Sequence, residues 1–110
     1  GNQVIELEMD LDGQVQQLRG EGNGPISAIL DALQLPIDVV NYEERSIGSG
    51  ANAKALALIE LQVKGTGKSA FGAGIHDNIV TASIEAIIAC TNRLIEQGVL
   101  STDQVVAAAV

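Results

Sequence analysis

Several residue types that common functions require are scarce in this sequence of 110 residues, which has one cysteine, one histidine, two aromatic residues and no tryptophan. The single cysteine, Cys90, excludes an internal disulfide and a cysteine-based metal site. The single histidine, His76, excludes a metal centre built from several histidines. With Tyr42 and Phe71 as the only aromatic residues, a surface that stacks nucleic-acid bases and an aromatic cage for cations are also excluded. The core must therefore consist of aliphatic side chains and alanine.

Basic residues are also few, with 6 Lys and Arg against 14 Asp and Glu and a formal net charge of −8. We therefore expect neither a nucleic-acid partner nor binding to an anionic membrane. No apolar run approaches the roughly 20 residues of a transmembrane helix. Length and an apolar content of 46% predict one folded domain, 1–110. Since neither a transmembrane run nor a signal-peptide pattern is present in the sequence, we expect it in the cytoplasm. Because the chain starts at Gly1-Asn2 without methionine, we interpret it as a fragment of a longer protein.

Alternation of apolar and polar residues with a period of two predicts half-buried strands. It is clearest at 4–11 and 53–63, and Asp12-Gly13 after the first of these predicts a hairpin turn. The predicted strands are 4–11, 14–18, 37–47, 53–63 and 69–71.

Two segments carry the apolar spacing of a helix face. The first begins at Pro25, after an N-cap at Asn23 or Gly24, and ends before Pro36. The second runs over 79–97, capped by Asp77 or Asn78. Ser101 and Gln104 have the spacing of a capping box for a short terminal helix.

The two halves of the chain repeat a pattern of strands, glycines and a helix. The helix residues match at an offset of 54 and the preceding glycine pairs at an offset of 52, so we interpret the second glycine loop as two residues longer. This predicts an α+β fold, a pseudo-symmetric repeat with two main helices on a mainly antiparallel sheet. The matched residues are Gly20, Gly22, Ile26, Ala28, Ala32 and Leu33 with Gly72, Gly74, Val80, Ala82, Ala86 and Ile87.

The two glycine-rich segments, 20–25 and 72–78, each come before a helix. Backbone N–H groups and the helix dipole at such a place favour an anion. A Walker lysine and the dinucleotide-binding spacing are absent, so a carboxylate is favoured over a phosphate. The alternative is that these glycines only form tight turns and helix caps.

A row of small residues, Ala51, Ala53, Ala55 and Ala57, follows one face of a predicted strand. It either packs closely against a helix or forms the floor of a small apolar pocket. Beside a carboxylate-binding helix end, such a pocket would suit an amino acid or a keto acid.

No catalytic constellation is convincing. Cys90 lies in the middle of a predicted helix and is best explained as a small buried residue, and a small enzyme using His76 and Asp77 stays open as an alternative. A cluster of four carboxylates would suit a divalent ion, but an acidic, solvated surface explains it better. These residues are Asp10, Asp12, Glu43 and Glu44.

Taken in order, motifs from Val4 to Arg93 resemble the C-terminal regulatory domain of 2-isopropylmalate synthase, which citramalate synthase shares. None of the motifs is specific by itself, but their order is. They are Gly22-Asn23-Gly24-Pro25-Ile26, Tyr42, Gly48-x-Gly50, Ala53-x-Ala55, Gly72-x-Gly74, Ile79-Val80-x-Ala82-Ser83-x-x-Ala86 and Asn92.

The resemblance implies an allosteric domain that binds leucine, or isoleucine in citramalate synthase, forms a homodimer and inhibits a separate catalytic barrel. That barrel would use a divalent metal and condense acetyl-CoA with 2-oxoisovalerate, whereas this domain would hold no cofactor, no metal and no catalytic residue. A stand-alone amino-acid-binding module is the alternative. The effector-binding residues that the resemblance implies are Asn23, Gly24, Ile26, Ser27, Val39, Tyr42, Ser46, Ala53, Ala55, Ile75, His76 and Asp77. The segment His76-Asp77-Asn78 departs from the family's pattern.

Overall fold

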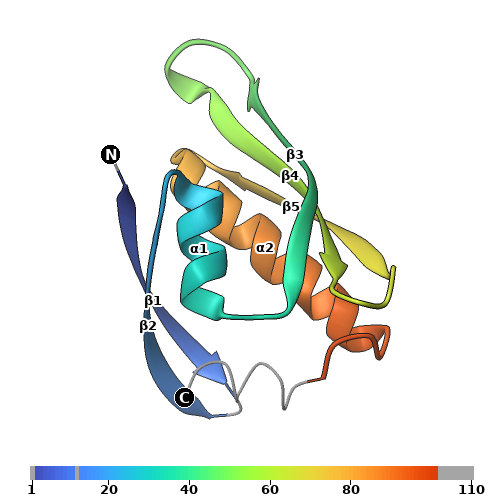
Figure 1. The fold of residues 1–110 in the computed structure, drawn as a ribbon. Helices are drawn as coiled ribbons and strands as arrows, with labels where there is room; N and C mark the ends of the chain where they lie inside the picture. The colour runs from blue at the N-terminus through green and yellow to red at the C-terminus, as the bar shows by residue number, and fades with distance from the viewer. Residues whose placement is uncertain (1, 12, 102–110) are drawn as a thin grey trace. The chain divides into compact units, whose positions relative to one another are not determined.

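The computed structural model describes residues 2–11 and 13–101 (Figure 1). This part of the chain forms antiparallel sheets of two and three strands and two α-helices, which confirms the α+β class. The chain divides into two compact units, one containing Gly1–Leu35 and the other Pro36–Leu100. The predicted helix capped by Ser101 and Gln104 falls on residues outside those described.

The first unit is a β-hairpin with one helix. Strands β1 (Gln3–Leu11) and β2 (Gln14–Gly22) pair antiparallel, with Gly13 in the turn at φ +84°. The predicted return strand ended at residue 18, so β2 is longer than expected. Helix α1 (Pro25–Leu33) begins after the N-cap Gly24 and buries four apolar residues against the hairpin. Its predicted start at Pro25 is confirmed.

The second unit is a three-stranded antiparallel sheet in the order β3-β4-β5, with one helix on it. Its strands are β3 (Ile37–Ile47), β4 (Lys54–Val63) and β5 (Ser69–His76), and a 3-10 turn, η1 (Gly50–Asn52), joins the first two. Helix α2 (Ile79–Glu96) packs on β4 and β5. The core lies between this helix and the sheet, and its largest fully buried side chains include Ile59, Leu61, Ile87 and Leu94.

The glycine pairs lie in strands and not in loops, so that prediction was wrong. Gly20 and Gly22 belong to β2, and Gly72 and Gly74 belong to β5. A Cβ atom on Gly74 would collide with the carbonyl oxygen of Ala82, and one on Gly20 with that of Ala28. The missing side chains therefore let each helix backbone come close to its strand.

The repeat itself is confirmed, but its register differs from the prediction. Gly20 faces the first helix as Gly74 faces the second, at the same offset of 54 that relates Ala28 to Ala82. The last residues of β2 and β5 and the two N-caps are related by this offset too. The two extra residues lie in the hairpin turn between β4 and β5, because the partners Leu11 and Gln14 enclose two residues whereas Val63 and Lys68 enclose four. In the described part of the chain, no helix is both long and apolar enough to cross a membrane.

Candidate functional site

Three of the predicted site residues form a row across one end of the β3-β4-β5 sheet. Ser46 on β3 is opposite Ala55 on β4, and Ala55 is opposite His76 on β5. Residues directly opposite each other in an antiparallel sheet share a face. By register, this row lies on the same face as Ala57, Ile59 and Leu61, which α2 covers. Tyr42, opposite Ile59, is on that face as well.

A shallow hollow of about 320 Å³ opens beside this row. Ala55 lines it and is half-buried, whereas Ala57, two residues further on, is completely buried. Each of the two explanations of the alanine row thus fits one residue: Ala57 packs closely against the helix, and Ala55 borders the hollow. Ala51 lies in the 3-10 turn and Ala53 directly after it. The full lining is Glu44, Arg45, Ser46, Ala55 and Ile79.

Tyr42 connects the sheet to the helix. Its hydroxyl lies 3.3 Å from the Oγ of Ser83, a fully buried residue of α2, and donates to Glu44 Oε2 at 2.9 Å. Burial raises the pKa of the Tyr42 hydroxyl above its ordinary value; the hydrogen bond with Ser83 lowers this pKa in part, and the neighbouring Glu44 raises it. The phenol therefore stays protonated and holds the Glu44 carboxylate in place.

The segment between β5 and α2 is occupied by its own hydrogen bonds. The backbone N–H of Asn78 donates to His76 Nδ1 at 3.1 Å. The side-chain oxygen of Asn78 accepts from the N–H groups of Val80 and Thr81 at 2.8 and 3.3 Å. Asn78 and not Asp77 is the N-cap, and it already uses two N–H groups that we had assigned to an anion.

The N-terminus of α1 has no such cap. Gly24 has no side chain with which to cap it, and the first turn contains no acidic residue. Asn23 and Ser27 are exposed, and Ile26 is half-buried. These four predicted site residues belong to the first unit, and by themselves they offer backbone N–H groups suited to a carboxylate.

Two predicted residues lie away from the row in the second unit. Val39 pairs with Leu61 near the other end of β3, roughly 20 Å from Ser46 at the rise of a strand. Ile75 is next to His76 in β5 and therefore points to the opposite face of the sheet. The structure gathers Tyr42, Ser46, Ala55 and His76 on one face, with Ala53 and Asp77 next to the strand ends.

Three residues that were not predicted belong to this site: Glu44 and Ile79 line the hollow, and Ser83 contacts the Tyr42 hydroxyl. Glu44 alternates with Tyr42 and Ser46 along β3, so a period of two could have placed it on the same face. Ser83 and Ile79 are four residues apart on α2 and so lie on one side of the helix. The sequence carried these signals, but Glu44 had been interpreted as solvated acidic surface.

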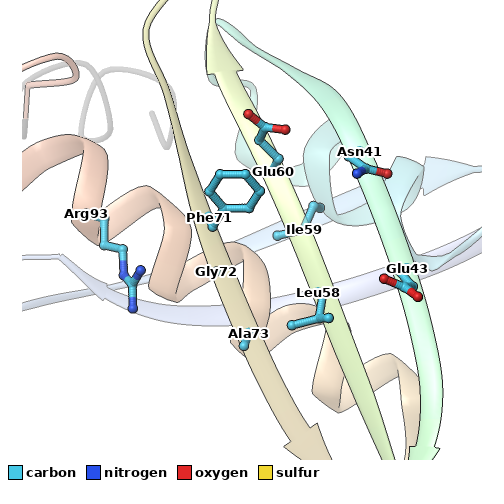
Figure 2. A pocket seen from close by; sticks show the side chains of 9 residues that line it. All are labelled: Asn41, Glu43, Leu58, Ile59, Glu60, Phe71, Gly72, Ala73 and Arg93. Atoms are coloured by element: carbon cyan, nitrogen blue, oxygen red, sulfur yellow. The ribbon is translucent and has the colours of Figure 1, made fainter.

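The other face of the same sheet, which we call the open face, carries a second hollow of about 220 Å³ (Figure 2). Phe71 stands at this hollow with 60% of its surface exposed. Glu43 on β3 and Arg93 on α2 lie on opposite sides of it (Figure 2). The lining is Asn41, Glu43, Leu58, Ile59, Glu60, Phe71, Gly72, Ala73 and Arg93.

The structure does not favour catalysis by Cys90. This residue is fully buried, its Sγ donates to the carbonyl oxygen of Ala70 at 3.0 Å, and burial raises the pKa of the thiol. It packs against Gly72, four residues and roughly 13 Å along β5 from His76. Within residues 2–11 and 13–101, no three His, Cys, Asp or Glu side chains group as metal ligands.

Known proteins similar to this chain are 2-isopropylmalate synthases. The chain is 43% identical over 98 residues to the enzyme of Cupriavidus taiwanensis, and this alignment covers 89% of the chain and 17% of that enzyme. It is 48% identical over 97 residues to the enzyme of Azoarcus sp. BH72 and 40% identical over 97 residues to that of Pseudomonas syringae pv. tomato, in both cases over 88% of this chain and 17% of the relative. The chain thus spans about one sixth of the length of these relatives. The profile of the LeuA allosteric (dimerisation) domain matches residues 1–95, and the chain belongs to this family.

Proposed function

We propose that this chain is the amino-acid-binding allosteric domain through which leucine inhibits a 2-isopropylmalate synthase. The observation that carries the proposal is the hollow at Ser46 and Ala55, which lies on residues that the resemblance implies for effector binding. The hollow combines apolar walls at Ala55 and Ile79 with polar groups on β3. This combination suits a small molecule with a branched apolar side chain and a charged end.

The chain itself would catalyse nothing. Condensation of acetyl-CoA with 2-oxoisovalerate, and the divalent metal it needs, belong to the catalytic barrel of the parent enzyme. Inhibition is then a coupling between two sites, and it requires only that the effector binds one state of the parent enzyme more tightly than another.

Calorimetric titration with leucine, isoleucine and valine tests the proposal. Leucine should bind most tightly, and at a hundredfold excess over its dissociation constant it should stabilise the fold by about 2.7 kcal/mol. Tighter binding of isoleucine would identify the effector domain of a citramalate synthase. If no branched-chain amino acid binds at millimolar concentration, the sensor function is wrong.

We also propose that the open face is where a second copy of the chain binds, in keeping with the family's description as a dimerisation domain. Phe71 protrudes beside a hollow of about 220 Å³, large enough to receive one side chain. A face with a protruding side chain next to a hollow can complement itself across a two-fold axis. With that axis parallel to β4 and above the open face, β3 of one copy would lie over β5 of the other, and Glu43 would come opposite Arg93 of the second copy.

Sedimentation of two variants tests this surface. Phe71→Asp should shift the chain from dimer to monomer at tens of micromolar. Val15→Asp is the matched control, because Val15 is equally exposed, at 60%, but lies on the hairpin of the first unit. A Phe71→Asp variant that remains dimeric would place the interface elsewhere.

A further inference from the structure

We propose that Glu44 binds the α-ammonium group of the effector and so distinguishes an amino acid from the keto acid with the same side chain. This inference rests on the proposed function. Leucine and 4-methyl-2-oxopentanoate share a carboxylate and a branched chain, and they differ only at the α-carbon. A sensor in an enzyme that consumes a branched keto acid needs a group that recognises that difference.

Glu44 is placed for this task by the register of β3. It lies between Tyr42 and Ser46 on alternate residues, and all three share the face that α2 covers in part. Together with Ser46, Ala55 and Ile79 it lines the hollow of about 320 Å³. A ligand in this hollow would therefore have a carboxylate and a hydroxyl on one side and apolar carbon on the other.

The carboxylate is also held in position before any ligand arrives. Glu44 Oε2 accepts from the Tyr42 hydroxyl at 2.9 Å, and that hydroxyl lies 3.3 Å from Oγ of the buried Ser83. In the described part of the chain Oε1 has no hydrogen bond. An ammonium group has three donors, and Glu44 Oε1, Ser46 Oγ and the Tyr42 oxygen are acceptors available on one face. Holding the carboxylate reduces the entropy lost on binding.

The charge of Glu44 is not compensated by the basic residue next to it. Arg45 also lines the hollow, but its guanidinium binds Glu43 Oε1 through Nε at 2.9 Å and Nη2 at 2.7 Å. No salt bridge involves Glu44 among the residues that the structure describes. The negative charge at the hollow is thus available to a cation. A divalent metal would need further carboxylates or imidazoles, and no such group of three is present among these residues.

The test compares leucine with 4-methylpentanoate, which has no ammonium group, as ligands of the 110-residue chain and its Glu44→Gln variant. Glutamine keeps the size and polarity of the side chain and removes only its charge. Loss of a charge-assisted hydrogen bond should weaken leucine binding roughly tenfold to a hundredfold. Binding of 4-methylpentanoate should stay within about twofold, because the ammonium group is what Glu44 recognises.

Glu96→Gln is the matched control, since it removes the same charge from an exposed glutamate at the C-terminal end of α2, whereas Ile79 at the hollow is the first residue of that helix. It should leave leucine binding unaltered. Equal leucine binding by Glu44→Gln and the unmodified chain would overturn the role of Glu44 and leave the proposed function intact. An equal loss for both ligands would also overturn it. If the unmodified chain binds no branched-chain amino acid, the proposed function fails first and this inference fails with it.

Discussion

Lengthening the side chain of Ala55 separates a ligand pocket from a packed core, and the structure provides its control two residues away. Ala55 lines the hollow and is half-buried, whereas Ala57 is 0% exposed and is paired with Gly74 beneath α2. Ala55→Leu and Ala57→Leu add the same three carbons to the same face of β4. Their effects should nevertheless be opposite.

The expected magnitudes follow from the two surroundings. At position 57 the new carbons have no space, and overpacking should cost about 1–3 kcal/mol, or about 5–15 °C in melting temperature for a chain of this size. At position 55 they enter the hollow, so the melting temperature should change by less than about 3 °C. Leucine binding should then fall by about tenfold to more than a hundredfold, since burying a leucine side chain is worth about 1.5–3 kcal/mol.

Thermal unfolding with and without leucine, together with calorimetric titration, measures both quantities on each variant. The pocket explanation requires Ala55→Leu to lose binding at an unchanged melting temperature, and Ala57→Leu to lose stability. If Ala55→Leu lowers the melting temperature as much as Ala57→Leu and its folded fraction still binds leucine, the hollow is not the effector site.

Two further predictions concern packing and pH. Gly74→Ala should lower the melting temperature by about 5 °C or more, because the added Cβ atom would meet the carbonyl oxygen of Ala82. Gly24→Ala is the control: nothing lies within 4 Å of the added atom, so the melting temperature should change by less than about 5 °C. Differential scanning calorimetry measures both variants. Burial raises the pKa of Tyr42 and of Cys90, so the unfolded chain loses these protons at a lower pH than the folded chain, and the free energy of unfolding should fall as the pH rises above about 9. Urea unfolding from about pH 8 to about pH 11, a range that extends past the ordinary tyrosine pKa, should show a smaller fall for Tyr42→Phe, and an equal fall would mean that Tyr42 does not contribute.

Hydrophobic periodicity was sufficient for the elements with a clear apolar face. Helix α2 and strand β4 follow the predicted ranges to within one residue. Strand β5 was predicted to end at Phe71 and in fact continues to His76, because Gly72 and Gly74 contribute no hydrophobic signal. Glycine nevertheless alternates with other residues from Phe71 to Ile75, which is the period of two expected of a strand. The glycines mark the strand face that a helix approaches most closely.

The predicted site came from family resemblance and contained no information on strand faces. Ile75 lies one residue from His76, and a single step along a strand reverses the face. Tyr42 and Val39 are three residues apart and would ordinarily point to opposite sides, but the register shift between Val39 and Asn41 keeps both on the side of α2. Such an irregularity depends on pairing with β4, which no local pattern in β3 reveals.

The repeat accounts for the difference between the two helix N-termini, since a side chain caps α2 but not α1 in the described part of the chain. At the offset of 54, Gly24 corresponds to Asn78 and Gly22 to His76, so the second unit has polar side chains where the first has glycines. In the second unit these side chains satisfy the helix N-terminus internally. Among the residues that the structure describes, no side chain caps the start of α1, whereas the second unit also contains β3, the strand that carries Glu44.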